Sequence, residues 1–300
     1  MMTFEQLAVF VAVAEREHLT QAAERLHLTP SAVSSALRKL EETYAIRLFD
    51  RVGRGLVLTT EGRLFLNEAR AILDRMQSAE RFLGELGGLD RGSLCIAASQ
   101  TIANHWLPDI LMRFHARYPG IAISLQIGNS AEVAKLVESG TAEVGYIEGN
   151  LENPVLSRRP VADDALMVVT RPDHPLAECT SVSAAELVAR SAWVLRERGS
   201  GTREVFETAM EVADMEPTAL DVVMELPSNE AVLCALRSDQ DARPVAGVVS
   251  CVVAAPWIAM GALTRIAFDL PVRTFTLLSH KDRHVSKAAE QFAELSLSRL

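Results

Sequence analysis

The sequence predicts three consecutive parts: a small helical module with a β-hairpin, a long helix, and a larger α/β part. Helical periodicity dominates the first 86 residues, glycines at 87, 88 and 92 interrupt it, and β-rich runs then alternate with helical segments. A chain of 300 residues, 49% of them hydrophobic, is long enough for about two domains with separate cores. We therefore expect a boundary near residues 88–92.

The charges are unevenly distributed along the chain. The 30 basic and 39 acidic residues give a formal net charge of −9, and a negative charge spread evenly over the surface would repel DNA. Residues 1–60 contain seven basic and seven acidic residues, so the whole acidic excess lies in residues 61–300. Any contact with nucleic acid must therefore be confined to a local basic surface.

The amino terminus and the cysteines predict a cytoplasmic protein. Glu5 stands where a secretory signal would carry a basic residue, and no small-residue cleavage site follows. The four cysteines form no CxxC motif and lie far apart, so we expect free thiols and no zinc site. We also expect no other metal and no cofactor. A redox-sensing pair formed by Cys234 and Cys251 is the alternative.

Residues 244–264 contain no charged side chain, and this length approaches that of a membrane span. Several prolines and glycines interrupt the stretch, among them Gly247 and Pro256. We therefore expect a buried α/β segment, with a strand at Gly247–Val253 and a short helix at Pro256–Gly261, rather than a membrane-spanning helix.

The first 44 residues predict three helices. Apolar residues repeat along the first helix, and a turn at 17–19 leads to a second helix at 21–26, which the Thr20 hydroxyl can cap. Thr29 and Pro30 then supply an N-cap hydroxyl and a first-turn proline for a third helix that ends near Tyr44.

The third helix has one apolar face and one polar face. Its apolar residues Val33, Leu37 and Leu40 are expected to face the interior. The opposite face carries small polar and basic side chains, namely Ser31, Ser34, Ser35, Arg38 and Lys39. Two short helices joined by a tight turn, the second of them polar and basic outside, are typical of a helix-turn-helix.

Two short β-like runs follow, Arg47–Phe49 and Leu56–Leu58, and they predict a β wing around residues 50–55. Five basic residues within 17 positions could neutralise DNA phosphates: Arg38, Lys39, Arg47, Arg51 and Arg54. A solvated charged face is the alternative for the helix alone. The helix and the wing together favour a winged helix-turn-helix domain that binds double-stranded DNA.

A long helix is predicted from Thr60 onward. Its apolar residues recur with spacings of 4, 3, 4, 3, 4 and 3, which makes three heptads: Phe65, Ala69, Ile72, Met76, Ala79, Leu83 and Leu86. A strict heptad stripe is normally buried against a partner helix, so the pattern predicts a homodimer. Packing of this helix on its own domain is the alternative.

After Gly92, strands and helices alternate. The expected elements are a strand at 94–98, a helix at 102–118, a strand at 121–127, a helix at 131–139 and a strand at 144–147. This order is typical of βαβ units in an α/β domain.

Short polar clusters stand immediately before three predicted helices: Ser99-Gln100-Thr101, Asn129-Ser130 and Gly199-Ser200-Gly201-Thr202. Free backbone N–H groups and the helix dipole favour anions at such positions, and the side chains can donate further hydrogen bonds. Each cluster alone is also typical of an ordinary N-cap. If the clusters meet in one cleft, they predict a site for a small anion.

Four motifs give a family resemblance: Ala22-Ala23-Glu24-Arg25-Leu26, Ser31-Ala32-Val33-Ser34, Leu40-Glu41 and Arg47-Leu48-Phe49-Asp50-Arg51. They resemble the LysR-type transcriptional regulators, and the resemblance extends over the whole chain. Family members typically carry Gln-Pro and Arg where this sequence has Pro30-Ser31 and Ser35. The resemblance implies binding of promoter DNA through Thr29, Pro30, Ser31, Ser34, Ser35, Arg38, Lys39, Arg51 and Arg54.

The same resemblance implies the domain organisation. A winged helix-turn-helix domain would span 1–59, a linker helix for dimerisation 60–88, and an effector-binding domain 89–300. That domain would resemble periplasmic binding proteins, with two Rossmann-like lobes formed by 92–161 with 268–300 and by 162–267. The resemblance further implies a homotetramer on the promoter and contact with RNA polymerase.

A narrower resemblance concerns the effector. The motifs Ser99-Gln100-Thr101-Ile102, Gly128-Asn129-Ser130, Ile147-Glu148-Gly149 and Arg196–Glu204 resemble regulators of sulfur metabolism, particularly a sulfite-responsive branch. This implies sulfite or a related oxyanion as effector, bound by Ser99, Gln100, Thr101, Asn129, Ser130, Gly149, Ser200, Gly201 and Thr202. We also expect Glu148 and Glu230 to pair with an Arg that closes the lobes, or to face solvent. A loop at 238–244 interrupts the family pattern near the cleft.

Three alternatives remain at the level of sequence. The first is a regulator of carbon-metabolism genes that senses a phosphorylated or carboxylated metabolite. The second is an α/β small-molecule enzyme, although the sequence has no phosphate-loop, nucleophile-elbow, HExxH or GxGxxG motif. The third is a ligand-binding protein without affinity for DNA. We predict a regulator and not an enzyme.

Overall fold

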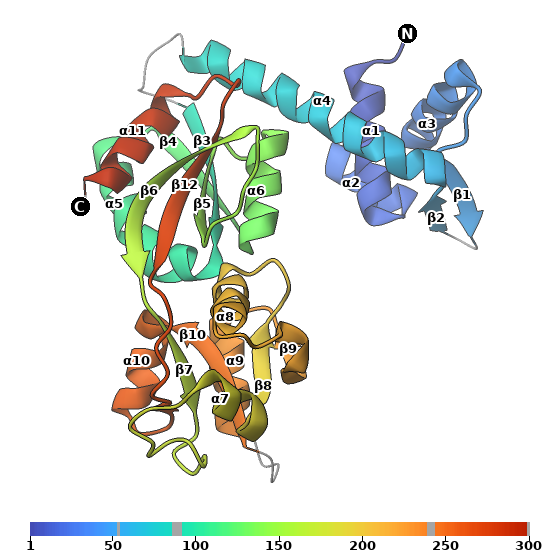
Figure 1. Cartoon of the computed structure of the whole chain (residues 1–300). Helices are drawn as coiled ribbons and strands as arrows, with labels where there is room; N and C mark the ends of the chain where they lie inside the picture. Colours follow the sequence, from blue (N-terminus) through green and yellow to red (C-terminus); the bar gives the residue numbers. More distant parts are fainter. Residues whose placement is uncertain (53–54, 86–91, 239–243, 299–300) are drawn as a thin grey trace. The chain divides into compact units, whose positions relative to one another are not determined.

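The computed structural model describes residues 1–52, 55–85, 92–238 and 244–298 of the chain (Figure 1). The chain forms two compact units, Met1–Leu83 and Gly84–Leu300. Each unit has its own hydrophobic core, so each is described by itself.

The amino-terminal unit is a winged helix-turn-helix. Its elements are α1 (Phe4–Arg16), α2 (Leu19–Leu26), α3 (Pro30–Tyr44), β1 (Phe49–Val52), β2 (Gly55–Leu58) and the long helix α4 (Thr60–Glu85). The fully buried ring of Phe10 lies at the centre of its core, with the rings of Phe49 and Phe65 at 5.4 and 4.9 Å. The core therefore joins α1, the wing and the start of α4.

The start of α2 corrects one sequence prediction. Glu17 adopts the left-handed conformation with φ of 51° and ends α1, and His18 is the extended residue that precedes α2. Because α2 already begins at Leu19, Thr20 lies inside the helix and is not its cap. The chain reverses in two residues here, which makes the turn shorter than predicted.

The carboxy-terminal unit contains two lobes, each built on a five-stranded sheet. The first sheet has the order β4-β3-β5-β12-β6, formed by β3 (Gly92–Ser99), β4 (Ile121–Gly128), β5 (Val144–Glu148), β6 (Leu156–Asp164) and β12 (Arg273–His280). Its helices are the π-helical turn η1 (Ile102–Trp106), α5 (Leu107–Arg117), α6 (Ser130–Ser139) and α11 (Lys287–Leu297).

The second sheet has the order β11-β7-β10-β8-β9. Its strands are β7 (Leu166–Thr170), β8 (Ala192–Arg196), β9 (Asp221–Leu226), β10 (Val245–Ser250) and β11 (Thr264–Arg265). Its helices are α7 (Ala184–Arg190), α8 (Gly201–Val212), the short turn η2 (Pro217–Ala219), α9 (Asn229–Ser238) and α10 (Cys251–Ala259).

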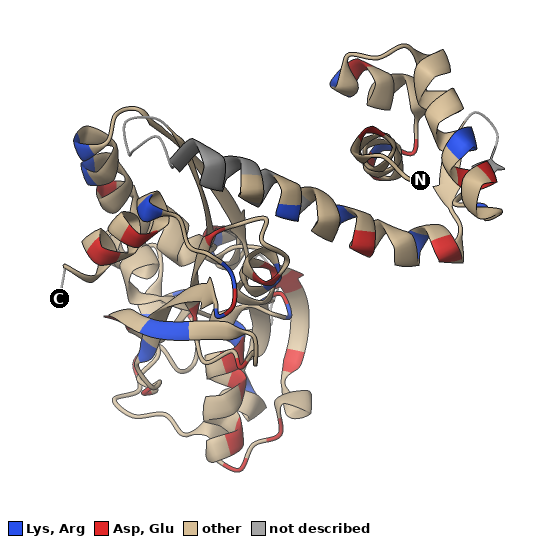
Figure 2. Ribbon diagram, turned by 90° about the horizontal axis from the view of Figure 1, so that it is seen from above, with Lys and Arg blue, Asp and Glu red and all other residues tan. Residues whose placement is uncertain are grey.

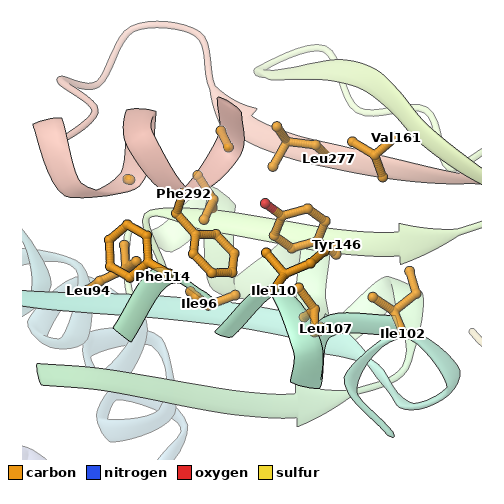
Figure 3. Packing of buried hydrophobic residues seen from close by; sticks show 14 of the residues in the cluster. Leu94, Ile96, Ile102, Leu107, Ile110, Phe114, Tyr146, Val161, Leu277 and Phe292 are labelled. Carbon is orange, nitrogen blue, oxygen red and sulfur yellow. The ribbon is translucent and has the colours of Figure 1, made fainter. Parts of the chain in front are cut away.

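Aromatic packing fixes the core of the first lobe (Figure 3). The rings of Phe114 on α5 and Tyr146 on β5 lie 5.3 and 6.0 Å from the ring of Phe292 on α11. The Tyr146 hydroxyl donates to Ser296 Oγ at 3.1 Å, and burial raises the pKa of this phenol well above its usual value. The packing holds α5 and α11 against the sheet.

Two connecting segments join the lobes. The chain leaves the first lobe after Asp164 and returns at Arg273, which lies opposite Asp164 in the antiparallel β6–β12 pair. The sequence had placed these crossings near Ala162 and Phe268. Both crossings lie later, because β6 continues to Asp164 and because Phe268 still packs on the core of the second lobe.

The uncharged stretch at 244–264 differs from its prediction. The strand β10 ends at Ser250, and α10 begins at Cys251 and includes Pro256, so Cys251–Val253 is helical rather than extended. The Cys251 N–H donates to the carbonyl of Ala165 at 2.8 Å, which fixes the turn from strand to helix. Within the described ranges, no helix combines the length and the apolar character that a membrane span requires.

Candidate functional sites

The α3 helix presents a polar face as the sequence predicts. Thr29 is its N-cap and accepts from the Ala32 N–H at 3.2 Å, Pro30 occupies the first turn, and the apolar face is buried. The remaining residues of the predicted interface lie on the opposite side, exposed except for half-buried Ser34: Ser31, Ser34, Ser35, Arg38 and Lys39. This face is long enough and polar enough to enter a major groove.

The basic residues of this face are available to phosphates. Arg38 lies 3.7 Å from Glu42, and both side chains are more than two-thirds exposed, so the ion pair contributes little to stability and a phosphate can replace Glu42 as the partner of Arg38.

The long helix α4 differs from this face, because Figure 2 shows basic and acidic residues interspersed along it. One of its basic residues, Arg70, forms an ion pair with Glu15 of α1 at 3.2 Å.

The wing is a two-stranded antiparallel hairpin in which Phe49 pairs with Leu58 and Arg51 with Leu56. The fold of this hairpin agrees with the predicted wing. The side chain of Arg51 and all of Arg54 lie outside the described residues, so their predicted contacts with DNA stay predictions.

The predicted heptad stripe on α4 divides into two parts. Ala69 is fully buried and Phe65 packs on Phe10, so both belong to the core of their own chain. Ile72 is 37% exposed, Met76 is half-buried and Ala79 is exposed. The Leu83 side chain and Leu86 lie outside the described residues. A partner helix could therefore meet α4 from Ile72 onward but not at its first turns, because α1 and the wing already cover them.

A buried polar network lies at the connection between the lobes, and we call it the interlobe network. It consists of Arg273, Glu148 and Asp164 together with the hydroxyls of Ser99, Thr101, Thr202 and Ser250. Residues of both lobes contribute, since Thr202 and Ser250 belong to the second lobe.

The guanidinium of Arg273 is fully buried at the centre of this network. Its Nε and Nη2 donate to Asp164 Oδ2 at 2.8 and 2.6 Å, and Nη1 donates to Glu148 Oε2 at 2.8 Å. The remaining N–H groups donate to Thr202 Oγ1 at 2.7 Å and Thr101 Oγ1 at 3.4 Å. All five donors therefore have acceptors, and Arg273 has none left for a ligand.

The two carboxylates are also fully engaged. Glu148 Oε1 accepts from Ser99 Oγ at 3.0 Å, and Asp164 Oδ1 accepts from Ser250 Oγ at 2.9 Å. One guanidinium faces two carboxylates, so the network carries a formal charge of −1. Buried charges require such complete pairing, because an uncompensated one costs several kcal/mol, about 3–5.

Three residues next to members of this network have buried polar atoms with open hydrogen-bonding capacity. Among the described residues, Gln100 Oε1, Ser200 Oγ and Asn229 Oδ1 are buried and have no hydrogen-bond partner. Ser200 precedes α8, whose first N–H groups have no acceptor within the helix. Asn229 Nδ2 donates across the lobes to Thr101 Oγ1 at 2.8 Å. The structure thus brings the predicted clusters at 99–101 and 200–202 together.

The side chains of the predicted cluster at 129–130 form a helix cap and a hydrogen bond to the backbone. Asn129 and Glu132 form a reciprocal cap at the start of α6, and Ser130 Oγ donates to the Glu148 carbonyl at 2.9 Å. The Ala131 N–H donates to the Gly199 carbonyl of the second lobe at 3.2 Å. These residues therefore hold the lobes together rather than present free donors.

Two glycines allow the close approach of α8 to β5. Gly149 has a φ of 85°, and a Cβ on Gly201 would lie 2.3 Å from the Glu148 carbonyl oxygen. A side chain at residue 201 would therefore push the lobes apart.

The acidic residues agree only in part with expectation. Glu148 pairs with Arg273, as expected for an Arg that closes the lobes. The Glu230 side chain is 43% exposed, which agrees with the solvent-facing alternative, and it contacts His105 at 3.3 Å and Asn104 at 3.4 Å rather than an arginine. Burial alone would raise the pKa of Glu230, but its backbone and these two side chains donate hydrogen bonds that hold the pKa below its usual value.

Sequence reasoning missed Arg273, Asp164 and Ser250. Arg273 and Asp164 lie 109 positions apart and belong to no local motif. Their signal in the sequence is weak: each is a charged residue beside a predicted crossing between the lobes. The pairing of β6 with β12 is what brings them into contact.

Comparisons with known proteins agree with this architecture. The family profile "Bacterial regulatory helix-turn-helix protein, lysR family" matches residues 4–63, and the profile "LysR substrate binding domain" matches residues 87–300. The chain is 34% identical over 298 residues to the uncharacterized HTH-type transcriptional regulator YeiE of Escherichia coli (strain K12), which covers 98% of this chain and 96% of that protein.

Two further proteins extend the comparison. The RuBisCO operon transcriptional regulator of Allochromatium vinosum is 33% identical over 303 residues, with 99% of this chain and 96% of that protein covered. The crystal structure of full-length CbnR complexed with its target DNA shares the fold, with a TM-score of 0.71, 23% identity and 99% coverage of both chains.

Proposed function

Because the chain belongs to the LysR family of bacterial transcriptional regulators, we propose that a small anionic effector, bound between the two lobes, controls its binding to promoter DNA. In this proposal, the polar face of α3 enters the major groove and the wing contacts phosphates or the minor groove. Two chains pair through α4 from Ile72 onward, and pairs of dimers assemble on one promoter.

The buried Ser200 hydroxyl at the amino terminus of α8 carries the effector proposal. It has no hydrogen-bond partner among the described residues, and the helix N-terminus beside it favours a negative charge. Thr101 and Thr202 support the same conclusion: their oxygens accept from Arg273, so their O–H groups remain to donate to a ligand. A ligand rich in acceptors therefore suits this cleft.

We propose sulfite or a related compact oxyanion as the effector, and this proposal rests on the sequence motifs around residues 99, 128, 147 and 200. The charge of the cleft supports a ligand of low charge. Glu148 and Asp164 together outweigh the charge of Arg273, so the network has a formal charge of −1. It therefore repels each additional negative charge that a ligand carries.

A phosphorylated or carboxylated metabolite of carbon metabolism is the second candidate. The relative from Allochromatium vinosum, named as a regulator of the RuBisCO operon, favours it. Such a ligand would use the same helix N-terminus for one anionic group, and its further groups would have to reach Gln100 and Asn229.

The test combines ligand binding with DNA binding. Purified full-length protein is screened by thermal shift against sulfite, sulfate, thiosulfate, phosphate and small carboxylates. Ligands that raise the melting temperature are then added to promoter-binding titrations at several salt concentrations, because binding to phosphates depends steeply on salt. The variant Ser200→Ala should lose the thermal shift while it keeps its affinity for DNA. A stabilising anion whose effect survives in Ser200→Ala would contradict the assignment of the cleft.

A further inference from the structure

A pocket lies beside the connection between the lobes, and Gly149, one of the residues predicted to bind the effector, is among the residues that line it. Its volume is about 460 Å³, which is within the range of small-molecule sites. Strands β6 and β12 and the segment Pro271–Val272 line one side of it, and α8 of the second lobe lines the other. We call it the hinge pocket. Arg273 also lines it, although its guanidinium is committed to the interlobe network.

An oriented arginine from the first lobe faces this pocket. Arg158 Nη1 donates to Asn150 Oδ1 at 2.9 Å and to the Leu151 carbonyl at 3.0 Å, so the guanidinium is held in place. Its Nε and Nη2 have no acceptor among the described residues. The free edge of Arg158 is therefore available for a carboxylate, which it can bind through two hydrogen bonds.

A carboxylate from the second lobe lines the same pocket. Glu204 on α8 forms no hydrogen bond or ion pair within the part of the chain that the structure describes. Partial burial raises its pKa, and the neighbouring Glu207 carboxylate adds to this effect. A Cβ built on Gly149 would lie only 3.4 Å from Glu204 Oε2, so this carboxylate borders the backbone at the end of β5. A cationic group beside Glu204 would oppose the effects of burial and of Glu207 on its pKa.

The rest of the lining is mixed. Its apolar part consists of Pro160, Val205, Pro271 and Val272, and Val272 is 65% exposed in the connecting segment. Its polar part consists of Asn150, Thr208, Thr274 and Thr276. Arg158 and Glu204 are both exposed, so a ligand with one charge would use only one of them, whereas a ligand with both charges can pair with both. The combination suits a molecule that carries both charges and an apolar body.

We propose that the hinge pocket binds a small zwitterion of the amino-acid type, with its carboxylate on Arg158, its ammonium group on Glu204 and its apolar body against Val205 and Val272. This ligand differs in charge from the proposed anionic effector, and its charged contacts are Arg158 and Glu204 rather than Ser200, so the inference does not rest on the proposed function. A zwitterion here contacts both lobes beside the segments that connect them.

The test is isothermal titration of the full-length protein with L-alanine, L-leucine and L-phenylalanine. At least one should bind, and for L-leucine two analogues isolate the charges: 4-methylpentanoate lacks the ammonium group and isopentylamine lacks the carboxylate. Each analogue should bind at least about tenfold more weakly than L-leucine, because one charge-assisted hydrogen-bonded contact is lost. Absence of binding by all three amino acids would overturn the proposal.

Variants separate the pocket from the rest of the surface. R158Q and E204Q should each weaken amino-acid binding about tenfold. Arg159 and Glu211 do not line the pocket but lie on the same strand and helix, so R159Q and E211Q are matched controls that should bind normally. Ser200→Ala should also bind the amino acid normally, which keeps this result independent of the anion cleft. Equal binding by R158Q, E204Q and the unaltered protein would contradict the assignment.

Discussion

Removing the charge of Arg273 alone should destabilise the carboxy-terminal unit more than removing the charges of Arg273, Glu148 and Asp164 together. The variant Arg273→Met deletes the donors to Asp164 and Glu148 and leaves two buried carboxylates without their cation. Loss of one partner of a buried ion pair costs about 3–5 kcal/mol of unfolding free energy. The triple variant R273M/E148Q/D164N keeps the shapes of the carboxylates without their charges, so we expect it to recover most of this loss.

Urea denaturation followed by tryptophan fluorescence measures this difference in the full chain. All three tryptophans, Trp106, Trp193 and Trp257, belong to the carboxy-terminal unit, so the signal reports its unfolding. With a typical dependence on urea, a loss of this size lowers the midpoint of the single variant by about 2 M. The control is Arg159→Gln, which removes an exposed arginine from the same lobe and should leave the midpoint unchanged.

Two outcomes would refute the reasoning. A single variant whose midpoint equals that of the unaltered protein would show that the two carboxylates do not depend on Arg273. A triple variant no more stable than the single one would show that shape, and not charge compensation, gives the network its stability.

The remaining predictions concern the cleft, the DNA-binding face and a buried histidine. Thr202→Val should abolish the response to the effector and leave DNA affinity within about twofold, because its hydroxyl is buried in the carboxy-terminal unit; collapse of DNA binding in the titrations would contradict the assignment of the cleft. Arg38→Ala should weaken promoter binding and make the logarithm of affinity fall less steeply with salt, and an unchanged slope would exclude a phosphate contact. Gly201→Ala should lower the unfolding free energy by about 2 kcal/mol, because its Cβ would meet the Glu148 carbonyl, and a urea midpoint equal to that of the unaltered protein would argue against this close approach. Burial and the positive charge of Arg190 lower the pKa of His174 below its ordinary value of 6.5, so the folded state favours the neutral ring. The stability that this ring contributes is therefore present above pH 6.5 and is lost as the pH falls through the lowered pKa, and His174→Gln should flatten this part of the stability profile measured by urea denaturation.

The elements that local chemistry determines could be predicted from the sequence. Thr29 and Pro30 fix the start of α3 through a cap and a first-turn proline, and the helical period then determines which side chains face outward. The same reasoning placed Ser99–Thr101 and Ser200–Thr202 at the starts of helices, because hydroxyls before a helical pattern are typical of N-termini.

The features that depend on distant residues could not be predicted. Asn129 fits a ligand site as well as it fits the cap that it forms, since both uses require the same side chain. The α4 stripe has the heptad spacing of a coiled coil, but Phe10 from another helix already covers Phe65. Arg273 and Asp164 meet only through the pairing of β6 with β12, which no local pattern records.

The position of Arg273 explains how a ligand without a charged partner could control the lobes. Thr101 belongs to the first lobe and Thr202 to the second, and both hydroxyl oxygens accept from the same guanidinium. Thr101 Oγ1 also accepts from Asn229 Nδ2 of the second lobe at 2.8 Å, so these contacts tie both hydroxyls to the present arrangement of the lobes. Under the proposed function, an anion that accepts hydrogen bonds from both threonines would bind this arrangement more tightly than an arrangement in which the lobes have separated. That difference in affinity is the quantity that shifts a conformational equilibrium, and about 1–3 kcal/mol of it is enough for the coupling found between ligand sites in regulatory proteins.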